Sequence, residues 1–238
     1  MKDTNIIANI WSKIRAVWKK DINVYFISGM CYNCKVFDRL TLPDGYKKNY
    51  IEWLEPTVDE PLEEYSKRMA GCIDTKRPFV LVGYSFGAVI VQEIARMTAP
   101  VKCIIISSFK QEKEKPAMFK LAHTTHILEK TPMRIYSSSE AITLFFNKYI
   151  CDAGLNEVKE YMTVIDPIYV KWAALQITRW KPMAVCPNIY HIHGTKDQIF
   201  PYTQLENVYP IPDGDHLMVI RKHEEVSRLL HTILSKKE

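Results

Sequence analysis

A serine stands between two glycines where two apolar segments of different periodicity meet. The segment Gly83-Tyr84-Ser85-Phe86-Gly87 follows an uninterrupted apolar run of strand length and leads into a run with helical spacing. A serine at such a strand–turn–helix corner projects its hydroxyl above the sheet edge, and flanking glycines avoid collisions with neighbouring backbone. The helix beginning at Phe86 points unpaired N–H groups at the same place, where they stabilise an oxyanion. The pattern favours a nucleophilic serine over an ordinary glycine-flanked loop.

This corner resembles the nucleophile elbow, Gly-x-Ser-x-Gly, of the α/β-hydrolase family. In that family the nucleophile is followed along the chain by an acid and then by a histidine. The resemblance covers nearly the whole chain and implies that Ser85 is the nucleophile of a Ser-His-Asp triad. A histidine would accept the serine proton, and the acid would orient that histidine.

The candidate acid is Asp197. A strand-like run ends in His193-Gly194, and an aspartate three residues past this glycine resembles the acid loop of the family. The histidine of this pattern is expected to be structural. The rival acids, Asp213 and Asp215, lie within three residues of the proposed histidine, too close to orient its ring from the next strand.

The candidate base is His216. It follows Gly214-Asp215 in a loop between the last predicted strand and a C-terminal helix, which matches the position of the catalytic histidine in the family. An ordinary loop histidine is the alternative. The order of serine, acid and histidine along the chain favours the catalytic interpretation.

The second half of an oxyanion hole is expected at Ser28-Gly29-Met30, after the first predicted strand. Many family members read His-Gly-x here and use a backbone N–H of this loop, so the resemblance implies that Met30 and Phe86 donate to the oxyanion. The serine in place of histidine leaves this donor intact because it belongs to the main chain. Gly29 lets the backbone come close, and Gly29 and Tyr84 are predicted to contact substrate. A plain strand-to-helix turn is the alternative.

Strand-like and helical segments alternate along much of the chain, which predicts a parallel sheet with right-handed crossovers. The resemblance implies the α/β-hydrolase fold, with a mostly parallel central sheet flanked by helices. The predicted strands are 21–29, 50–54, 78–82, 101–107, 188–194 and 207–211. The predicted helices are 36–40, 61–73, 86–99, 221–234 and an amphipathic segment, 4–20, whose apolar face suits docking on the core better than a membrane surface.

The alternation stops between residues 110 and 187, before the last two strands. Helical segments follow one another there, at 117–128, 139–151, 156–164 and 168–180. The resemblance implies that this insertion is a helical cap that covers the serine and shapes the substrate pocket. His123 and His126 have no third ligand near them, so we expect surface histidines and no metal site.

Composition indicates one globular domain over residues 1–238. The chain is 47% hydrophobic and 25% charged, and its net charge of +5 is spread in short runs, which argues against nucleic-acid binding. Six cysteines form no disulfide framework, and neither a secretory signal nor a bilayer-spanning run is present, so we expect a reduced, cytoplasmic setting without stable membrane insertion. Cys31 and Cys34 have redox-motif spacing, but their context favours packing.

These features predict a serine hydrolase. It would cleave a carboxylic ester or thioester with an apolar acyl group through an acyl-enzyme intermediate, without a metal or organic cofactor. The fold hosts many activities, so it does not choose the substrate. The alternative is a catalytically silent protein that keeps the fold and holds a small apolar ligand or a partner. Ligand holding alone does not require the serine, acid and histidine together. The sequence makes no prediction of oligomeric state.

Overall fold

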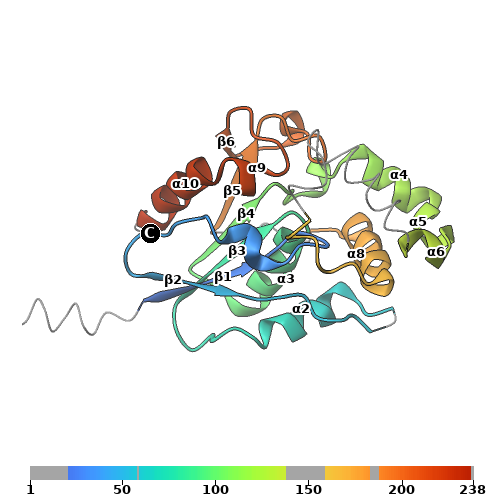
Figure 1. Cartoon of the computed structure of the whole chain (residues 1–238), viewed down its shortest axis with the longest axis horizontal. Helices are drawn as coiled ribbons and strands as arrows, with labels where there is room; N and C mark the ends of the chain where they lie inside the picture. Colours follow the sequence, from blue (N-terminus) through green and yellow to red (C-terminus); the bar gives the residue numbers. More distant parts are fainter. Residues whose placement is uncertain (1–20, 58, 138–158, 183–187, 237–238) are drawn as a thin grey trace, which may run out of the picture.

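The computed structural model is built on a six-stranded sheet in which every pair of neighbouring strands is parallel (Figure 1). It describes residues 21–57, 59–137, 159–182 and 188–236. The strand order is β2-β1-β3-β4-β5-β6. The strands are β1 (Ile22–Ile27), β2 (Tyr46–Tyr50), β3 (Phe79–Tyr84), β4 (Lys102–Ile106), β5 (Ile189–Gly194) and β6 (Tyr209–Ile211). The predicted parallel sheet flanked by helices is confirmed.

The direction of strand addition reverses at β1. The chain runs outward from β1 to β2, returns to the other side of β1 as β3, and continues through β4 and β5 to β6. In open parallel sheets a crevice opens beyond the carboxyl ends of the strands at such a reversal. The loops that follow β1 and β3 flank this crevice, and they carry Met30 and Ser85.

The two central strands explain why the sheet is easy to recognise in the sequence. All residues of β3 and β4 are buried. A parallel strand covered on both faces needs an almost continuous apolar run, and these two strands have one.

The strand predicted over residues 50–54 is wrong. The strand is Tyr46–Tyr50, whose sequence YKKNY carries little apolar signal because β2 is an edge strand. The apolar residues that follow it leave the sheet. Trp53 packs its indole on Phe86 at 5.4 Å between ring centroids and donates to the Gly29 carbonyl at 3.1 Å. This segment therefore supports the loops at the carboxyl edge.

Helices cover both faces of the sheet. In Figure 1, α2 (Leu62–Ala70) and α3 (Phe86–Thr98) lie on the lower side, and α10 (His223–Ser235) lies on the upper side. The predicted helices 61–73 and 86–99 correspond to the first two. The predicted helix 221–234 is divided at Lys222, where α9 (Met218–Arg221) ends and α10 begins.

The described residues between β4 and β5 add no strand to the sheet. They form η2 (Glu112–Glu114), α4 (Ala117–Thr125), α5 (Ile127–Lys130), α6 (Met133–Tyr136) and α8 (Pro167–Arg179). The predicted helix 117–128 is broken at His126, which has a left-handed φ of 53°. Helix α8 packs against α4, α5 and α6, so these helices form one group at the right of Figure 1.

The predicted helix 156–164 is wrong in its described part. Residues 161–164 bond to the loop after β1 and form no helix. Asn33 donates its N–H to the Tyr161 carbonyl at 2.8 Å, and Val164 donates to the Cys31 carbonyl at 3.2 Å. The predicted helices 4–20 and 139–151 lie outside the described residues. No helix within the described ranges is long and apolar enough to cross a membrane.

Candidate active site

Ser85 occupies a strained corner between β3 and α3. Its backbone has φ 53° and ψ −116°, a conformation that residues other than glycine rarely adopt. A Cβ added at Gly83 would lie 2.4 Å from the Gly87 carbonyl oxygen, and one added at Gly87 would lie 2.3 Å from the Ile27 carbonyl oxygen. Both glycines are therefore required by close backbone contacts, as the elbow pattern predicts.

Three side chains from different loops form a continuous hydrogen-bonded series. Ser85 Oγ lies 3.0 Å from His216 Nε2, and His216 Nδ1 lies 2.8 Å from Asp197 Oδ2. The other oxygen of Asp197 accepts the N–H groups of Ile199 and Phe200 at 2.9 and 3.0 Å. Ser85, His216 and Asp197 are the three residues predicted from the sequence, and the structure brings them together.

The rival acids face other partners. Asp213 pairs with Lys196 at 2.9 Å on the surface, and Asp215 pairs with Arg221. Neither occupies the position beside the imidazole of His216 that Asp197 holds.

The electrostatics of the series define which nitrogen carries the proton. Burial acts to raise the pKa of Asp197, but the charge and hydrogen bond of His216 outweigh it, so this pKa lies below its usual value. An ionised carboxylate only accepts hydrogen bonds, so His216 Nδ1 carries a proton when it faces Asp197. In the neutral ring, Nε2 then presents its lone pair to the Ser85 hydroxyl, which is the arrangement of a general base.

The loop that carries His216 is held firmly from two sides. Tyr84 donates its phenol O–H to the His216 carbonyl at 2.9 Å. A Cβ added at Gly194 would lie 2.2 Å from the Gly214 carbonyl oxygen, and that oxygen accepts the N–H of Lys196 at 2.8 Å. The acid and histidine loops are thereby packed backbone to backbone.

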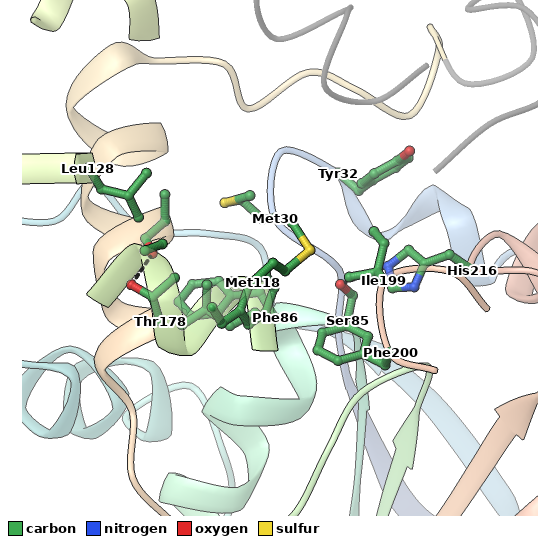
Figure 2. Close-up of a pocket in the computed structure, with 14 residues that line it drawn as sticks. Met30, Tyr32, Ser85, Phe86, Met118, Leu128, Thr178, Ile199, Phe200 and His216 are labelled. Carbon is green, nitrogen blue, oxygen red and sulfur yellow. Dashed lines mark hydrogen bonds between the residues drawn. The ribbon is translucent and has the colours of Figure 1, made fainter. Parts of the chain in front are cut away.

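An apolar cavity of about 140 Å³ opens beside Ser85 and His216 (Figure 2). Its walls come from helices α4, α5 and α8, from the loop after β1 and from the acid loop. The lining residues besides Ser85 and His216 are Met30, Tyr32, Phe86, Met118, Phe119, Ala122, Leu128, Ala174, Ile177, Thr178, Ile199 and Phe200. The described walls contribute hydroxyl groups but no carboxylate, ammonium or guanidinium group.

The four remaining predicted site residues divide into two pairs. Met30 and Phe86 line the cavity, and the N–H of Phe86 has no acceptor within the helix because Phe86 is its first residue. Gly29 and Tyr84 are not among the lining residues, so the cavity does not support their predicted substrate contact, which stays a prediction. A Cβ added at Gly29 would lie 3.3 Å from Ser85 Cβ, so this glycine allows a close approach behind the site.

Phe200 was not predicted from the sequence, and the cap helices were expected to shape the pocket without any of their residues being assigned to it. The Phe200 ring lies 5.7 Å from the His216 ring and is fully buried. Sequence reasoning also missed a contact between His191 and His193, whose ring nitrogens are 3.2 Å apart. Their spacing by two residues in a strand was the available signal, because it places both side chains on one face.

Other candidate chemistry finds little support in the described part of the chain. No group of three or more His, Cys, Asp or Glu side chains there could hold a metal ion. The thiols of Cys31 and Cys34 are both buried, and burial raises the pKa of each to about 12. Thiols with such a high pKa are poor nucleophiles near neutral pH, which favours the packing interpretation.

Comparison with known proteins extends these observations. A family model described as the alpha/beta hydrolase family matches residues 36–229. A thermophilic esterase from Thermogutta terrifontis has a TM-score of 0.68 at 17% identity, with 90% of each chain covered. A carboxylesterase of Nitrososphaera gargenis has a TM-score of 0.67 at 14% identity, with 91% of each chain covered. ClbQ of the colibactin NRPS/PKS pathway has a TM-score of 0.63 at 14% identity, covering 90% of this chain and 97% of its own.

Identities this low show a shared fold alone. No curated protein sequence matches the chain. The family model, in contrast, matches well over half of the residues, and the protein belongs to the alpha/beta hydrolase family.

Proposed function

We propose that this protein is a serine hydrolase that cleaves a carboxylic ester or thioester with a short, uncharged acyl group. The observation that carries the proposal is the unbroken series Ser85–His216–Asp197, with contacts of 3.0 and 2.8 Å, at the mouth of an apolar cavity. A serine–histidine–carboxylate series is the arrangement that activates a hydroxyl for acyl transfer. The similar structures described as esterases agree with this chemistry.

The reaction follows from the roles of the three side chains. His216 Nε2 accepts the proton of Ser85 Oγ as this oxygen attacks the substrate carbonyl, and Asp197 stabilises the imidazolium that forms. The tetrahedral intermediate expels the alcohol or thiol, which takes the proton from His216, and leaves an acyl-serine. Water then attacks the acyl-serine by the same steps and releases a carboxylic acid.

The oxyanion of each intermediate requires N–H donors near Ser85. Phe86 offers an N–H without a helical acceptor, and Met30, on the loop after β1, also lines the cavity (Figure 2). In comparable sites one such donor contributes about 3 to 4 kcal/mol to the stability of the transition state. Both groups are main-chain donors, so side-chain substitutions at these positions retain them.

The cavity supports a particular class of acyl group. Its volume of about 140 Å³ is close to the roughly 150 Å³ of an apolar cavity that binds benzene, which corresponds to roughly four to six acyl carbons. The described walls offer no ionic partner for a charged acyl end, and an unpaired buried charge is strongly unfavourable. We therefore favour a short monocarboxylic acyl group over a dicarboxylic one.

The helices between β4 and β5 fit the role of a cap within the single domain. Met118, Phe119 and Ala122 of α4 face Ala174 and Ile177 of α8 across the cavity. They would enclose the acyl chain and exclude water around the reacting carbonyl, which strengthens electrostatic stabilisation there.

The first test is labelling by a fluorophosphonate, followed by intact mass measurement. The wild type should gain one adduct, and Ser85→Ala should gain none. The matched control is Ser66→Ala, because Ser66 is fully buried in α2 and its Oγ has no partner within the described residues. This control should label like the wild type. Absence of labelling on the folded wild type would instead favour a silent, ligand-binding protein.

Substrate class is tested with p-nitrophenyl esters and thioesters of graded chain length. We expect kcat/KM to rise from acetyl to a maximum near butyryl or hexanoyl and to fall for longer chains. A preference for long-chain or ω-carboxylated substrates would contradict the assignment of the cavity as the acyl site.

A further inference from the structure

A buried lysine stands at the start of a hydrogen-bonded series that leads to the candidate active site. Lys110 follows β4, and its side chain is only 4% exposed. Its ammonium contacts three acceptors: Glu114 Oε1 at 3.2 Å, His191 Nδ1 at 3.4 Å and the Glu206 carbonyl oxygen. A lysine ammonium has three N–H donors and no acceptor, so every donor is used.

These contacts determine which ring nitrogen carries the proton in His191 and in His193. Because the ammonium only donates, His191 Nδ1 must accept, and in the neutral ring the proton is then on Nε2. His191 Nε2 lies 3.2 Å from His193 Nδ1, and His193 Nε2 lies 2.8 Å from the Phe200 carbonyl oxygen. A carbonyl only accepts, so His193 also carries its proton on Nε2. Both ends of the series require the same orientation.

Both rings are in an environment that keeps them neutral. His191 and His193 are 1% and 0% exposed. Burial is the largest cause that lowers the pKa of His191 well below its usual value, and His193 and Lys110 lower it further, whereas a hydrogen bond with the Ser108 backbone acts in the opposite direction. Burial also lowers the pKa of His193, against the opposing charge of Asp197. A neutral ring carries a single proton, so the donor direction is defined at each step.

The lysine itself is held by a rigid anchor. Glu114 is fully buried, and one of its oxygens accepts the backbone N–H of Lys110 at 2.9 Å. Its other oxygen accepts the backbone N–H of Glu206 at 3.2 Å. The ammonium is therefore fixed between the end of β4 and the chain before β6. Its N–H donor to His191 Nδ1 has a fixed position.

Phe200, at the far end of the series, contacts the catalytic groups in two ways. Its backbone N–H donates to Asp197 Oδ1 at 3.0 Å, and its ring lies 5.7 Å from the ring of His216. Its carbonyl is the group held by His193. A shift of this residue would move both the carboxylate and the imidazole relative to Ser85.

We propose that Lys110 is a positioning residue for the hydrolysis. Through the donor series Lys110→His191→His193→Phe200, it keeps Asp197 and His216 in hydrogen-bonding position relative to Ser85. The inference rests on the proposed function. It assigns no contact with substrate to Lys110, His191 or His193. These residues act through Phe200 and through Asp197, whose Oδ2 lies 3.6 Å from His193 Nε2.

The first experiment compares two buried lysines. Lys110→Met keeps the aliphatic stem and removes the donors. Lys102→Met is the control, because Lys102 is also buried and donates to the Lys236 carbonyl at 2.6 Å, away from the site. On the best ester found for the wild type, Lys110→Met should lower kcat about tenfold or more with KM within about twofold, since small misplacements of catalytic groups act on kcat. The control should retain the wild-type kcat. Equal kcat in the two variants would overturn the proposal.

A second pair keeps the test decisive if Lys110→Met does not fold. His193→Gln retains an amide donor for the Phe200 carbonyl, whereas His193→Leu has none. We expect the glutamine variant to recover most of the wild-type kcat and the leucine variant to lose it at comparable melting temperature. A role in packing alone predicts the opposite order, because leucine is the better apolar filler.

Nitrogen NMR of protein labelled at histidine tests the series without any turnover. Protonated and unprotonated imidazole nitrogens give separate ¹⁵N resonances, and we expect both His191 and His193 to be protonated on Nε2. A proton on His193 Nδ1 would overturn the proposal. If the wild type shows this spectrum but neither fluorophosphonate labelling nor turnover, the donor series stands, and the proposed function, with the positioning role, is refuted.

Discussion

Lowering the pH from about 7.5 to about 5.5 is expected to destabilise the fold through His191 and His193. Both rings are buried, and burial is the largest cause that lowers the pKa of each below its usual value. The change of pH therefore acts on two imidazole rings that are neutral in the folded protein and become protonated in the unfolded chain.

The magnitude follows from the difference in bound protons. The unfolded chain takes up one proton on each histidine below about pH 6.5, so the free energy of unfolding decreases as the pH falls. Each ring that stays neutral in the folded protein lowers the free energy of unfolding by about 1.4 kcal/mol at one pH unit below about pH 6.5. Two such rings set an upper limit of about 2.8 kcal/mol at pH ~5.5.

Carboxylates with lowered pKa values do not change the free energy of unfolding between about pH 7.5 and 5.5. The pKa of Asp197 lies below its usual value, and that of Glu129 is about 2 because hydrogen bonds and the charge of Arg179 outweigh its burial. Their contributions are present above about pH 4 and are lost only as the pH falls further. The decline between about pH 7.5 and 5.5 is thus assigned to histidines.

Urea unfolding at the two pH values measures the effect. His191→Gln removes one of the two groups, so the loss of stability between the two conditions should shrink by up to about 1.4 kcal/mol. Ser66→Ala is the control, because it removes a buried side chain that does not titrate, and it should keep the wild-type dependence. An unchanged pH dependence in His191→Gln would refute the claim that this ring is neutral in the fold.

Four further predictions address the site. Asp197→Asn should lower kcat roughly 10⁴-fold, because the amide favours the wrong tautomer of His216; steady-state kinetics check it, with thermal melting to establish that the variant is folded. Gly87→Ala should lower the free energy of unfolding by about 4 kcal/mol or more in urea titrations, since its Cβ would lie 2.3 Å from two carbonyl oxygens. Ala174→Phe should fill the cavity and reduce kcat/KM for hexanoyl esters at least about tenfold while sparing acetyl esters; rates for the two esters decide it. Iodoacetamide near pH 8 should modify the exposed Cys72 well before Cys31 and Cys34, whose pKa values are about 12, as peptide mass mapping would show.

Residues whose roles depend on neighbours in the chain could be predicted from the sequence. Gly83 and Gly87 prevent collisions within one turn and with the adjacent strand, so five consecutive residues suffice to mark Ser85. The central strands were equally clear, because strands covered on both faces are continuous apolar runs. Asp197 and His216 followed from a resemblance that orders them along the chain, and the contacts of 2.8 and 3.0 Å agree with that order.

Edge and loop elements were predicted less well because their partners are distant. The YKKNY strand pairs with β1 by backbone bonds, and none of its side chains is fully buried, so no apolar pattern marks it. Residues 161–164 bond to residues 31–33, more than a hundred positions away, instead of forming a helix. Gly29 and Tyr84 are adjacent in sequence to Met30 and Ser85, yet only the latter two line the cavity, because neighbours in a chain can point to opposite sides.

The parallel sheet and Ser85 could be predicted from the sequence because strand burial and turn sterics are local properties, and Asp197 and His216 could be predicted from the order that the family resemblance implies. The surroundings of these groups depend on the tertiary structure. Lys110 contacts His191 across 81 positions and Glu206 across 96, and the cavity joins α4, α8 and the acid loop. Such contacts depend on how separate elements pack together, and no periodicity along one segment records the identity of a side chain on another.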